Sequence, residues 1–122
     1  MGNNDKFQYQ VQLILQQQQA QITPEVIELL AEIKQSGSLL LATQHCHFSY
    51  NKAWRLIKQV EHEIHTPLVH SVNGGANGGG THLTETGILI LKKYISFQKK
   101  VTPLVEQCFQ EVFATGESNN HE

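Results

Sequence analysis

Residues 49–64 read SYNKAWRLIKQVEHEI, and the spacing of their apolar residues predicts an amphipathic helix. These residues recur mostly every three or four positions, which places their side chains on one side of a helix: Ala53, Leu56, Ile57, Val60 and Ile64. Ser49 supplies a hydroxyl of the kind preferred at a helix N-cap, and Thr66-Pro67 ends the pattern. We therefore expect a helix over residues 49–65.

The opposite side of this helix is polar and basic, and carries Asn51, Arg55, Lys58 and His62. Asn and Arg side chains are shaped for paired hydrogen bonds to adenine and guanine edges, and Asn51 and Arg55 lie one turn apart near the helix start. Tyr50 and Lys52 flank this side, while the Ser49 hydroxyl and the first free amides can hold a phosphate. A solvated helix face without a binding function remains the alternative.

The distribution of charge matters more than the formal total of -2. No acidic residue lies between Lys34 and Val60, a stretch that contains the bases Lys34, Lys52, Arg55 and Lys58. Acidic residues gather in the helix that begins near Glu25 and from Glu106 onward. This segregation favours a nucleic-acid surface, although a basic run is also compatible with a solvated face.

Two further helices are predicted before this one. Thr23-Pro24-Glu25 has the hydroxyl, proline and acid typical of a helix start, and Gly37 ends the apolar pattern that follows: Val26, Ile27, Leu30 and Ile33. Ser38 then caps a short helix from Leu39 to about Cys46, and His47-Phe48 form a tight turn.

The second half of the chain predicts a hairpin and a long helix. Short strands at 68–72 and 81–83 bracket the glycine-rich residues 73–80, which we expect to form a mobile hairpin tip. A helix over about 84–114 follows, kinked or divided by Pro103, with an apolar series at Ile88, Leu91, Ile95, Val101, Val105, Cys108 and Val112. Residues 115–122 are expected to be a flexible polar tail.

At the other end of the chain, apolar residues alternate with glutamines from Phe7 to Leu15, the period of a strand with one buried face. Gln16 to Gln19 are interpreted as a surface loop or continuation. Cys46 and Cys108 lie in apolar patterns, which suits free buried thiols in a reducing compartment. The chain has no apolar run long enough to cross a membrane, so we expect a cytoplasmic protein.

Together these elements predict a mainly α (α+β) fold, a winged helix-turn-helix over residues 1–114. The sequence resembles the N-terminal domain of the molybdate-dependent ModE-type regulators and, more distantly, LysR-type regulators. The matching stretches are residues 33–38 (IKQSGS), 48–54 (FSYNKAW), 74–80 (glycine-rich) and 83–87 (LTETG), within a resemblance that covers about 7–113.

The resemblance implies a dimer whose third helix enters the major groove and whose wing, residues 73–80, contacts the backbone or minor groove. With the side chains already assigned, the expected DNA contacts are Ser49, Tyr50, Asn51, Lys52, Arg55, Lys58, Asn73 and Asn77. Dimer contacts are expected from the first strand and last helix at Val11, Leu13, Leu91, Ile95, Val105 and Cys108. The sequence departs from the family pattern at Ala76-Asn77, where a lysine is usual, and at His70-Ser71, where Glu-Arg is usual.

We therefore expect a sequence-specific regulator of transcription that binds double-stranded DNA as a homodimer, without a cofactor, bound metal or membrane. We also expect it to lack the molybdate-binding domain and to respond instead to a separate effector-binding protein or to its own abundance. The alternative is a winged helix that serves protein interaction alone. Enzyme chemistry is not expected: Gly74–Thr81 lacks the lysine of a phosphate-binding loop, and His45-Cys46-His47 is not spaced as a metal site.

Overall fold

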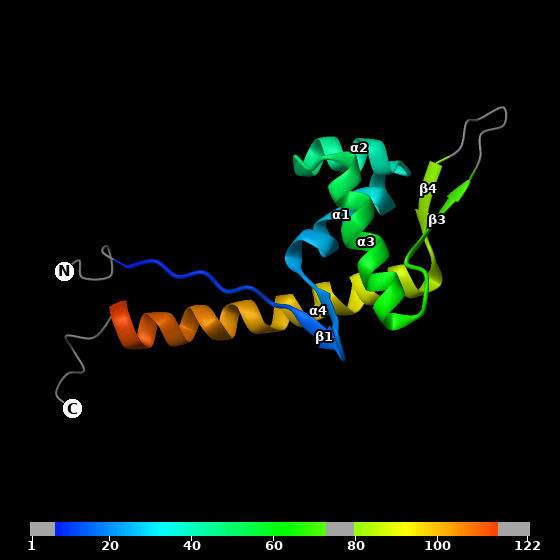
Figure 1. The fold of residues 1–122 in the computed structure, drawn as a ribbon. Helices are drawn as coiled ribbons and strands as arrows, with labels where there is room; N and C mark the ends of the chain where they lie inside the picture. The colour runs from blue at the N-terminus through cyan, green and yellow to red at the C-terminus, as the bar shows by residue number, and fades with distance from the viewer. Residues whose placement is uncertain (1–6, 73–79, 115–122) are drawn as a thin grey trace. The chain divides into compact units, whose positions relative to one another are not determined.

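The computed structural model, drawn as a ribbon in Figure 1, describes residues 7–72 and 80–114. These residues form two compact units. The larger unit is Gln12–Tyr94, and the smaller unit combines residues 7–11 with 95–114. The elements in chain order are β1 (Leu15–Gln17), β2 (Ala20–Ile22), α1 (Pro24–Ser36), α2 (Leu39–Cys46), α3 (Tyr50–Ile64), β3 (Val69–Val72), β4 (Gly80–Leu83) and α4 (Glu85–Phe109), followed by a π-helical turn (Gln110–Ala114). The predicted tail, 115–122, lies outside the described residues.

Helices α1 and α2 begin and end where the sequence predicts. The Thr23 hydroxyl accepts a hydrogen bond of 3.4 Å from the Val26 amide at the start of α1. Gly37 ends this helix with φ 69°, a conformation that glycine adopts without a steric penalty. Ser38 then caps α2 by accepting a bond of 3.1 Å from the Leu41 amide. Both helix boundaries are set by local capping chemistry, which is why the sequence predicts them.

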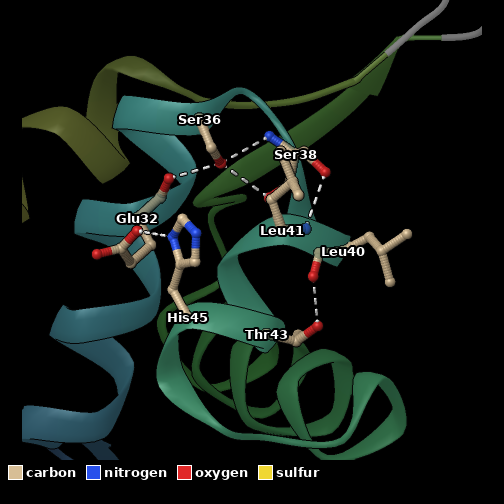
Figure 2. Close-up of polar contacts among 7 residues, drawn as sticks. All are labelled: Glu32, Ser36, Ser38, Leu40, Leu41, Thr43 and His45. Carbon is tan, nitrogen blue, oxygen red and sulfur yellow. Dashed lines mark hydrogen bonds and ion pairs between the residues drawn. The ribbon is translucent and has the colours of Figure 1, made fainter.

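The junction between α1 and α2 is held by short polar contacts, which Figure 2 shows. The Ser36 hydroxyl lies 2.8 Å from the Glu32 carbonyl and accepts a hydrogen bond of 3.2 Å from the Ser38 amide. Glu32 also reaches across to α2, where its Oε1 lies 2.8 Å from Nδ1 of His45. These contacts fix the direction in which the chain leaves α1 and enters α2.

Helix α3 packs against α1, α2 and β2 within the larger unit. The Ser49 hydroxyl caps it by accepting a bond of 3.1 Å from the Lys52 amide, and His65, with φ 59°, ends it. The core is built from fully buried side chains of α1, α3 and the segment before β3: Val26, Leu29, Leu30, Ile33, Ile57 and Leu68. The predicted apolar stripe of α3 is therefore confirmed, although Leu56 and Ile64 are only partly buried.

Glu61 of α3 is a buried acidic residue whose role is not predicted by the sequence. The Glu61 carboxylate accepts hydrogen bonds from the backbone amides of Leu68, at 2.7 Å, and Val69, at 3.1 Å. Its other oxygen lies 3.1 Å from Nζ of Lys58. Glu61 thus connects the last turns of α3 to the first residue of β3.

Strands β3 and β4 pair in antiparallel register from Val69↔Leu83 to Val72↔Gly80, which confirms the predicted hairpin strands. The Thr81 amide donates a hydrogen bond of 3.0 Å to the Gly37 carbonyl. A Cβ atom at Gly80 would lie 2.6 Å from the same oxygen, so only glycine permits this approach. The base of the hairpin is therefore fixed against the end of α1.

Helix α4 begins at the predicted place, with the Thr84 hydroxyl accepting a bond of 3.1 Å from the Gly87 amide. Of the two expectations for Pro103, division of the helix is wrong, because α4 continues from Glu85 to Phe109, while a kink stays a prediction. A proline removes one amide donor, which leaves the carbonyl four residues earlier, at Lys99, without a helical partner. Lys99 is exposed, so water can satisfy that carbonyl.

The strand predicted over residues 7–15 is also wrong for its greater part. Residues 7–14 have no regular secondary structure, and β1 begins only at Leu15. A strand needs a backbone partner as well as an alternating pattern, and the described chain supplies one only from Leu15, which pairs with Ile22. The glutamine run forms part of β1 and the turn after it, where Gln18 has φ 55°.

Residues 7–11 instead lie on the C-terminal part of α4 within the smaller unit. Phe7 packs on Phe113 with ring centres 5.6 Å apart, and Tyr9 packs on Phe109 at 4.7 Å. The Tyr9 hydroxyl donates a hydrogen bond to the Glu106 carboxylate. The N-terminal segment is thus held by aromatic contacts and one polar contact rather than by strand pairing.

Candidate nucleic-acid interface

The structure places the predicted contact residues of the third helix on one side of α3. We call this set the α3 surface: Ser49, Tyr50, Asn51, Lys52, Arg55 and Lys58. All are exposed except Lys52, which is half-buried. Ala53, Ile57 and Val60 occupy the buried side of the same helix. The amphipathic pattern therefore presents these polar groups to solvent.

The first basic residue of the α3 surface, Lys52, is engaged by neighbouring side chains. Its Nζ lies 3.8 Å from Oε2 of Glu25 and 4.8 Å from the centre of the Phe48 ring. Exposed ion pairs of this kind contribute roughly 0–1 kcal/mol, so a phosphate can displace Glu25 at little cost.

Lys58 and Arg55 differ in how they are held. The Nζ of Lys58 lies 3.1 Å from Glu61 and 4.6 Å from the centre of the Trp54 ring. Arg55 has no hydrogen bond or ion pair with any residue in the described part of the chain. The guanidinium of Arg55 is thus available to a ligand, while the Lys58 charge is already partly compensated.

Trp54 lies at the border between the two sides of α3. It is half-buried, and its ring meets that of Tyr50 edge-on at 6.5 Å with an interplanar angle of 84°. Trp54 therefore packs against the neighbouring side chains Tyr50 and Lys58.

The start of α3 offers amide donors beside this surface. The Ser49 hydroxyl accepts from the Lys52 amide and keeps its own hydrogen for a second partner. The amides of the first turn have no helical acceptor, so they and the Ser49 hydroxyl can donate to a phosphate oxygen.

The predicted wing contacts Asn73 and Asn77 lie outside the described residues. The structure describes the hairpin base below them, where His70 and His82 are both exposed. The sequence does not predict that these two residues lie together, because their pairing depends on the register of the two strands.

The predicted dimer residues differ in their exposure. Val11 is 52% exposed, Cys108 is exposed, and Ile95, Val105 and Leu13 are partly exposed. Leu91 is only 4% exposed and belongs to the core of the larger unit, so it is not available to a second chain. Leu104 on α4 is 62% exposed. The sequence does not predict it as a dimer residue, because it lies outside the apolar series expected along this helix.

The expectation of two buried thiols is wrong. Cys108 is exposed, since no part of the described smaller unit covers this position, and Cys46 is only half-buried. Partial burial and the nearby carboxylates of Glu28 and Glu32 raise the pKa of Cys46, which keeps its thiol protonated.

Two further observations concern the kinds of site considered from the sequence. Within residues 7–72 and 80–114, no helix has both the length and the apolar character needed to cross a membrane. Over the same residues, no three His, Cys, Asp or Glu side chains come together as a set of metal ligands.

Helices α1 to α3, followed by the β3–β4 hairpin and a long helix, define a winged helix-turn-helix of the α+β class, which confirms the predicted fold. The sequence comparisons agree with this class. The chain is 37% identical over 78 residues to the transcriptional regulator ModE of Haemophilus influenzae, 36% over 85 residues to the molybdenum transport protein ModE of Azotobacter vinelandii, and 33% over 78 residues to the transcriptional regulator ModE of Yersinia pestis. No protein-family model matches the sequence.

These alignments cover 64%, 66% and 64% of this chain, and 31%, 32% and 30% of the respective relatives. The chain thus spans about a third of the length of the curated relatives it matches. The aligned part is a homologue of part of the ModE-type regulators, which confirms the resemblance found in the sequence. The more distant likeness to LysR-type regulators stays a prediction.

Proposed function

We propose that this chain is a sequence-specific, double-stranded DNA-binding regulator of transcription whose α3 enters the major groove. The observation that carries the proposal is the exposed pair Asn51 and Arg55, one turn apart near the start of a helix-turn-helix recognition helix, with Arg55 free of any described partner. The names of two of the relatives, which are transcriptional regulators, support the regulatory role.

Each group of the α3 surface has a proposed role that follows from its chemistry. Arg55 reads a guanine edge with its planar fork, and Asn51 reads an adenine edge. Ser49, Tyr50 and Lys52 bind phosphates around the start of α3, which positions the helix without reading sequence. Lys58 binds a phosphate farther along, where it must first leave Glu61.

The wing, residues 73–80, contacts the DNA backbone or minor groove in this proposal, with Asn73 and Asn77 as hydrogen-bonding residues. Support comes from the hairpin base, which the Thr81–Gly37 hydrogen bond fixes against α1 in the same unit as α3. A fixed base gives the wing a defined starting point beside the recognition helix.

We propose that the active form is a homodimer formed through the smaller unit. The support is exposed apolar surface: Leu104, Val11 and Cys108 are open to solvent, and Ile95 and Val105 are half-buried. A monomer of this size rarely leaves so many apolar groups in one short region uncovered. Leu13 of the larger unit is proposed as a separate dimer contact, whereas Leu91 serves the fold.

The protein acts in the cytoplasm as a regulator rather than as an enzyme, and uses no cofactor in binding DNA. Its partners are DNA, a second copy of the chain and a separate effector-binding protein.

The experiment compares Arg55→Ala with Lys58→Ala on a preferred duplex selected from random sequences. Arg55→Ala should lose about 1–3 kcal/mol on the preferred duplex and relax the choice of base at one position. Lys58→Ala should weaken all duplexes alike and lower the slope of log affinity against log salt by at most about one unit, because Glu61 already compensates part of its charge.

Lys100→Ala is the matched control, since it removes one exposed lysine outside the α3 surface. Binding is measured by fluorescence anisotropy at several salt concentrations, after circular dichroism has shown that each variant is folded. An Arg55→Ala protein that discriminates its site from random DNA as well as the parent would contradict the proposed role of α3.

A second candidate function is a winged helix that binds only other proteins. The observation that favours it is the pairing of Lys52 and Lys58 with Glu25 and Glu61, which weakens the positive field of the α3 surface. A protein contact of this kind would change little with salt, while DNA binding should fall steeply as salt rises.

A further inference from the structure

Two histidines face each other across the outward side of the β3–β4 hairpin. His70 and His82 are directly opposite in the register, between the pairs Val69↔Leu83 and Ser71↔Thr81. Both are exposed, and their ring centres lie 5.9 Å apart with an interplanar angle of 42°. Opposite residues in an antiparallel pair are close enough for their side chains to act together.

We propose that His70 and His82 form a binding site for a divalent transition-metal ion such as Zn²⁺, Ni²⁺ or Cu²⁺. Neutral imidazole is a preferred ligand of these ions, in contrast to the oxygen ligands that Mg²⁺ and Ca²⁺ select. The site lies at the base of the wing and is independent of whether the protein binds DNA.

The separation of the rings fits a bridging ion. A Zn–N bond of about 2.0–2.1 Å puts the ion roughly 3.2 Å from each ring centre. Ring centres would then be about 5.2 Å apart at a tetrahedral N–Zn–N angle and about 6.4 Å apart at a linear one. The observed 5.9 Å lies between these limits, so the spacing of the two rings is compatible with one shared ion.

Both imidazoles are free to bind. Neither ring has a hydrogen bond or ion pair with a described residue, whereas His45 is paired with Glu32. The His82 ring lies over two glycines, since an added Cβ atom would come within 3.3 Å of Nε2 at Gly80 and within 3.6 Å of Cε1 at Gly37. Both side chains are exposed, so an ion can reach the two rings from solvent.

The site has two protein ligands, since the described residues contain no larger cluster of His, Cys, Asp and Glu. Water completes the coordination, which makes the site weaker than a closed structural zinc site. Binding holds the two strands together at the base of the hairpin.

The test measures Zn²⁺ and Ni²⁺ binding to the full chain, without an affinity tag, by competition with a chromogenic chelator and by thermal unfolding. The exposed thiol of Cys108 is removed first by Cys108→Ser, because thiolates also bind zinc. His70→Ala and His82→Ala are the test variants. A double variant, His62→Ala with His65→Ala, is the matched control, since it removes two other exposed histidines.

We expect Zn²⁺ and Ni²⁺ to raise the midpoint of thermal unfolding in the parent and the control, by an amount that grows with metal concentration. Each single test variant should weaken binding at least tenfold, and Mg²⁺ should have no effect on any of the proteins. The proposal is overturned if the parent binds neither ion, if both test variants bind as the parent does, or if only the control loses binding.

Discussion

The Oε2 atom of Glu61 accepts a hydrogen bond of 2.7 Å from the backbone amide of Leu68. The same oxygen accepts a second bond from the Val69 amide, and the carboxylate is buried. Glu61→Gln keeps the shape of the side chain but replaces a charged acceptor by a neutral one. We expect the free energy of unfolding to fall by about 1–3 kcal/mol.

Urea unfolding followed by circular dichroism measures this change. Glu63→Gln is the control, because it makes the same substitution two residues away, where no buried amide depends on the carboxylate. Equal stability of the Glu61→Gln and Glu63→Gln proteins would show that the negative charge of Glu61 does not strengthen the two buried bonds.

Gly87 allows α4 to begin directly against the segment before β3. A Cβ atom at this position would lie 2.3 Å from the Leu68 carbonyl oxygen, closer than real contacts allow. Gly87→Ala should therefore displace backbone and lower the free energy of unfolding by roughly 1–3 kcal/mol, despite the better helix propensity of alanine. Thermal unfolding checks this, and Gln98→Ala, at an exposed position of the same helix, should be nearly neutral.

Replacing residues 73–79 with a two-residue Asn-Gly turn tests the wing. Gly80 is kept, because it pairs with Val72 and lies against Gly37. Stability should change little, since loop length carries only a logarithmic entropy cost, while affinity for the preferred duplex should fall. If the shortened protein binds DNA as tightly as the parent, the wing takes no part in binding.

The homodimer is tested by sedimentation at micromolar concentration, where the parent should exceed the 13.8 kDa of one chain. Leu104→Asp places a charge on an exposed apolar position and should weaken the dimer without unfolding the chain. Leu91→Asp instead buries a charge in the core of the larger unit and should unfold it. A parent that sediments as a monomer would contradict the proposed assembly.

The contact between Tyr9 and Glu106 predicts how the attachment of the N-terminal segment depends on pH. Its hydrogen bond lowers the pKa of Glu106, with a smaller effect from Gln110, and raises the pKa of Tyr9. Because the pKa of Glu106 is lowered, its carboxylate stabilises the attachment at pH values above the ordinary carboxyl pKa of 4.5. This stabilisation is lost as the pH falls through the lowered pKa. Because the pKa of Tyr9 is raised, its protonated hydroxyl stabilises the attachment at pH values below the ordinary tyrosine pKa of 10.0. This stabilisation is lost as the pH rises through the raised pKa.

Nuclear Overhauser contacts between the rings of Phe7 and Phe113 measure this attachment across the pH range. We expect them to be strongest between the two limits and weaker in acid and in strong alkali. Tyr9→Phe removes the hydroxyl, so its contacts should be weaker at neutral pH and should change less with pH. Identical profiles for the two proteins would contradict the role of the hydrogen bond.

The parts of the fold that the sequence predicts well depend on neighbouring residues. Ser38 and Ser49 bond to amides three residues later, so a short stretch of sequence contains both partners of each cap. The orientation of α3 likewise follows from its apolar period. The α3 surface could therefore be assembled from sequence before any tertiary contact was known.

The parts that could not be predicted depend on distant partners. The role of Glu61 requires knowing that Leu68 and Val69 return beside it, and the pairing of Lys52 with Glu25 joins separate helices. The alternation from residue 7 gives the period of a strand but not the neighbour that a strand needs. For the same reason, the apolar spacing of α4 does not reveal that Leu91 is buried within its own chain.

The contact between Gly80 and Gly37 constrains how this sequence can vary. Every amino acid other than glycine carries a Cβ atom, and at Gly80 that atom would meet a backbone oxygen, which cannot rotate away as a side chain can. In a saturation mutagenesis library selected for folded protein, every missense change at this codon should therefore be depleted, whatever the polarity or size of the new residue. The codon for His82, two residues later, should tolerate many replacements, because the His82 side chain is exposed.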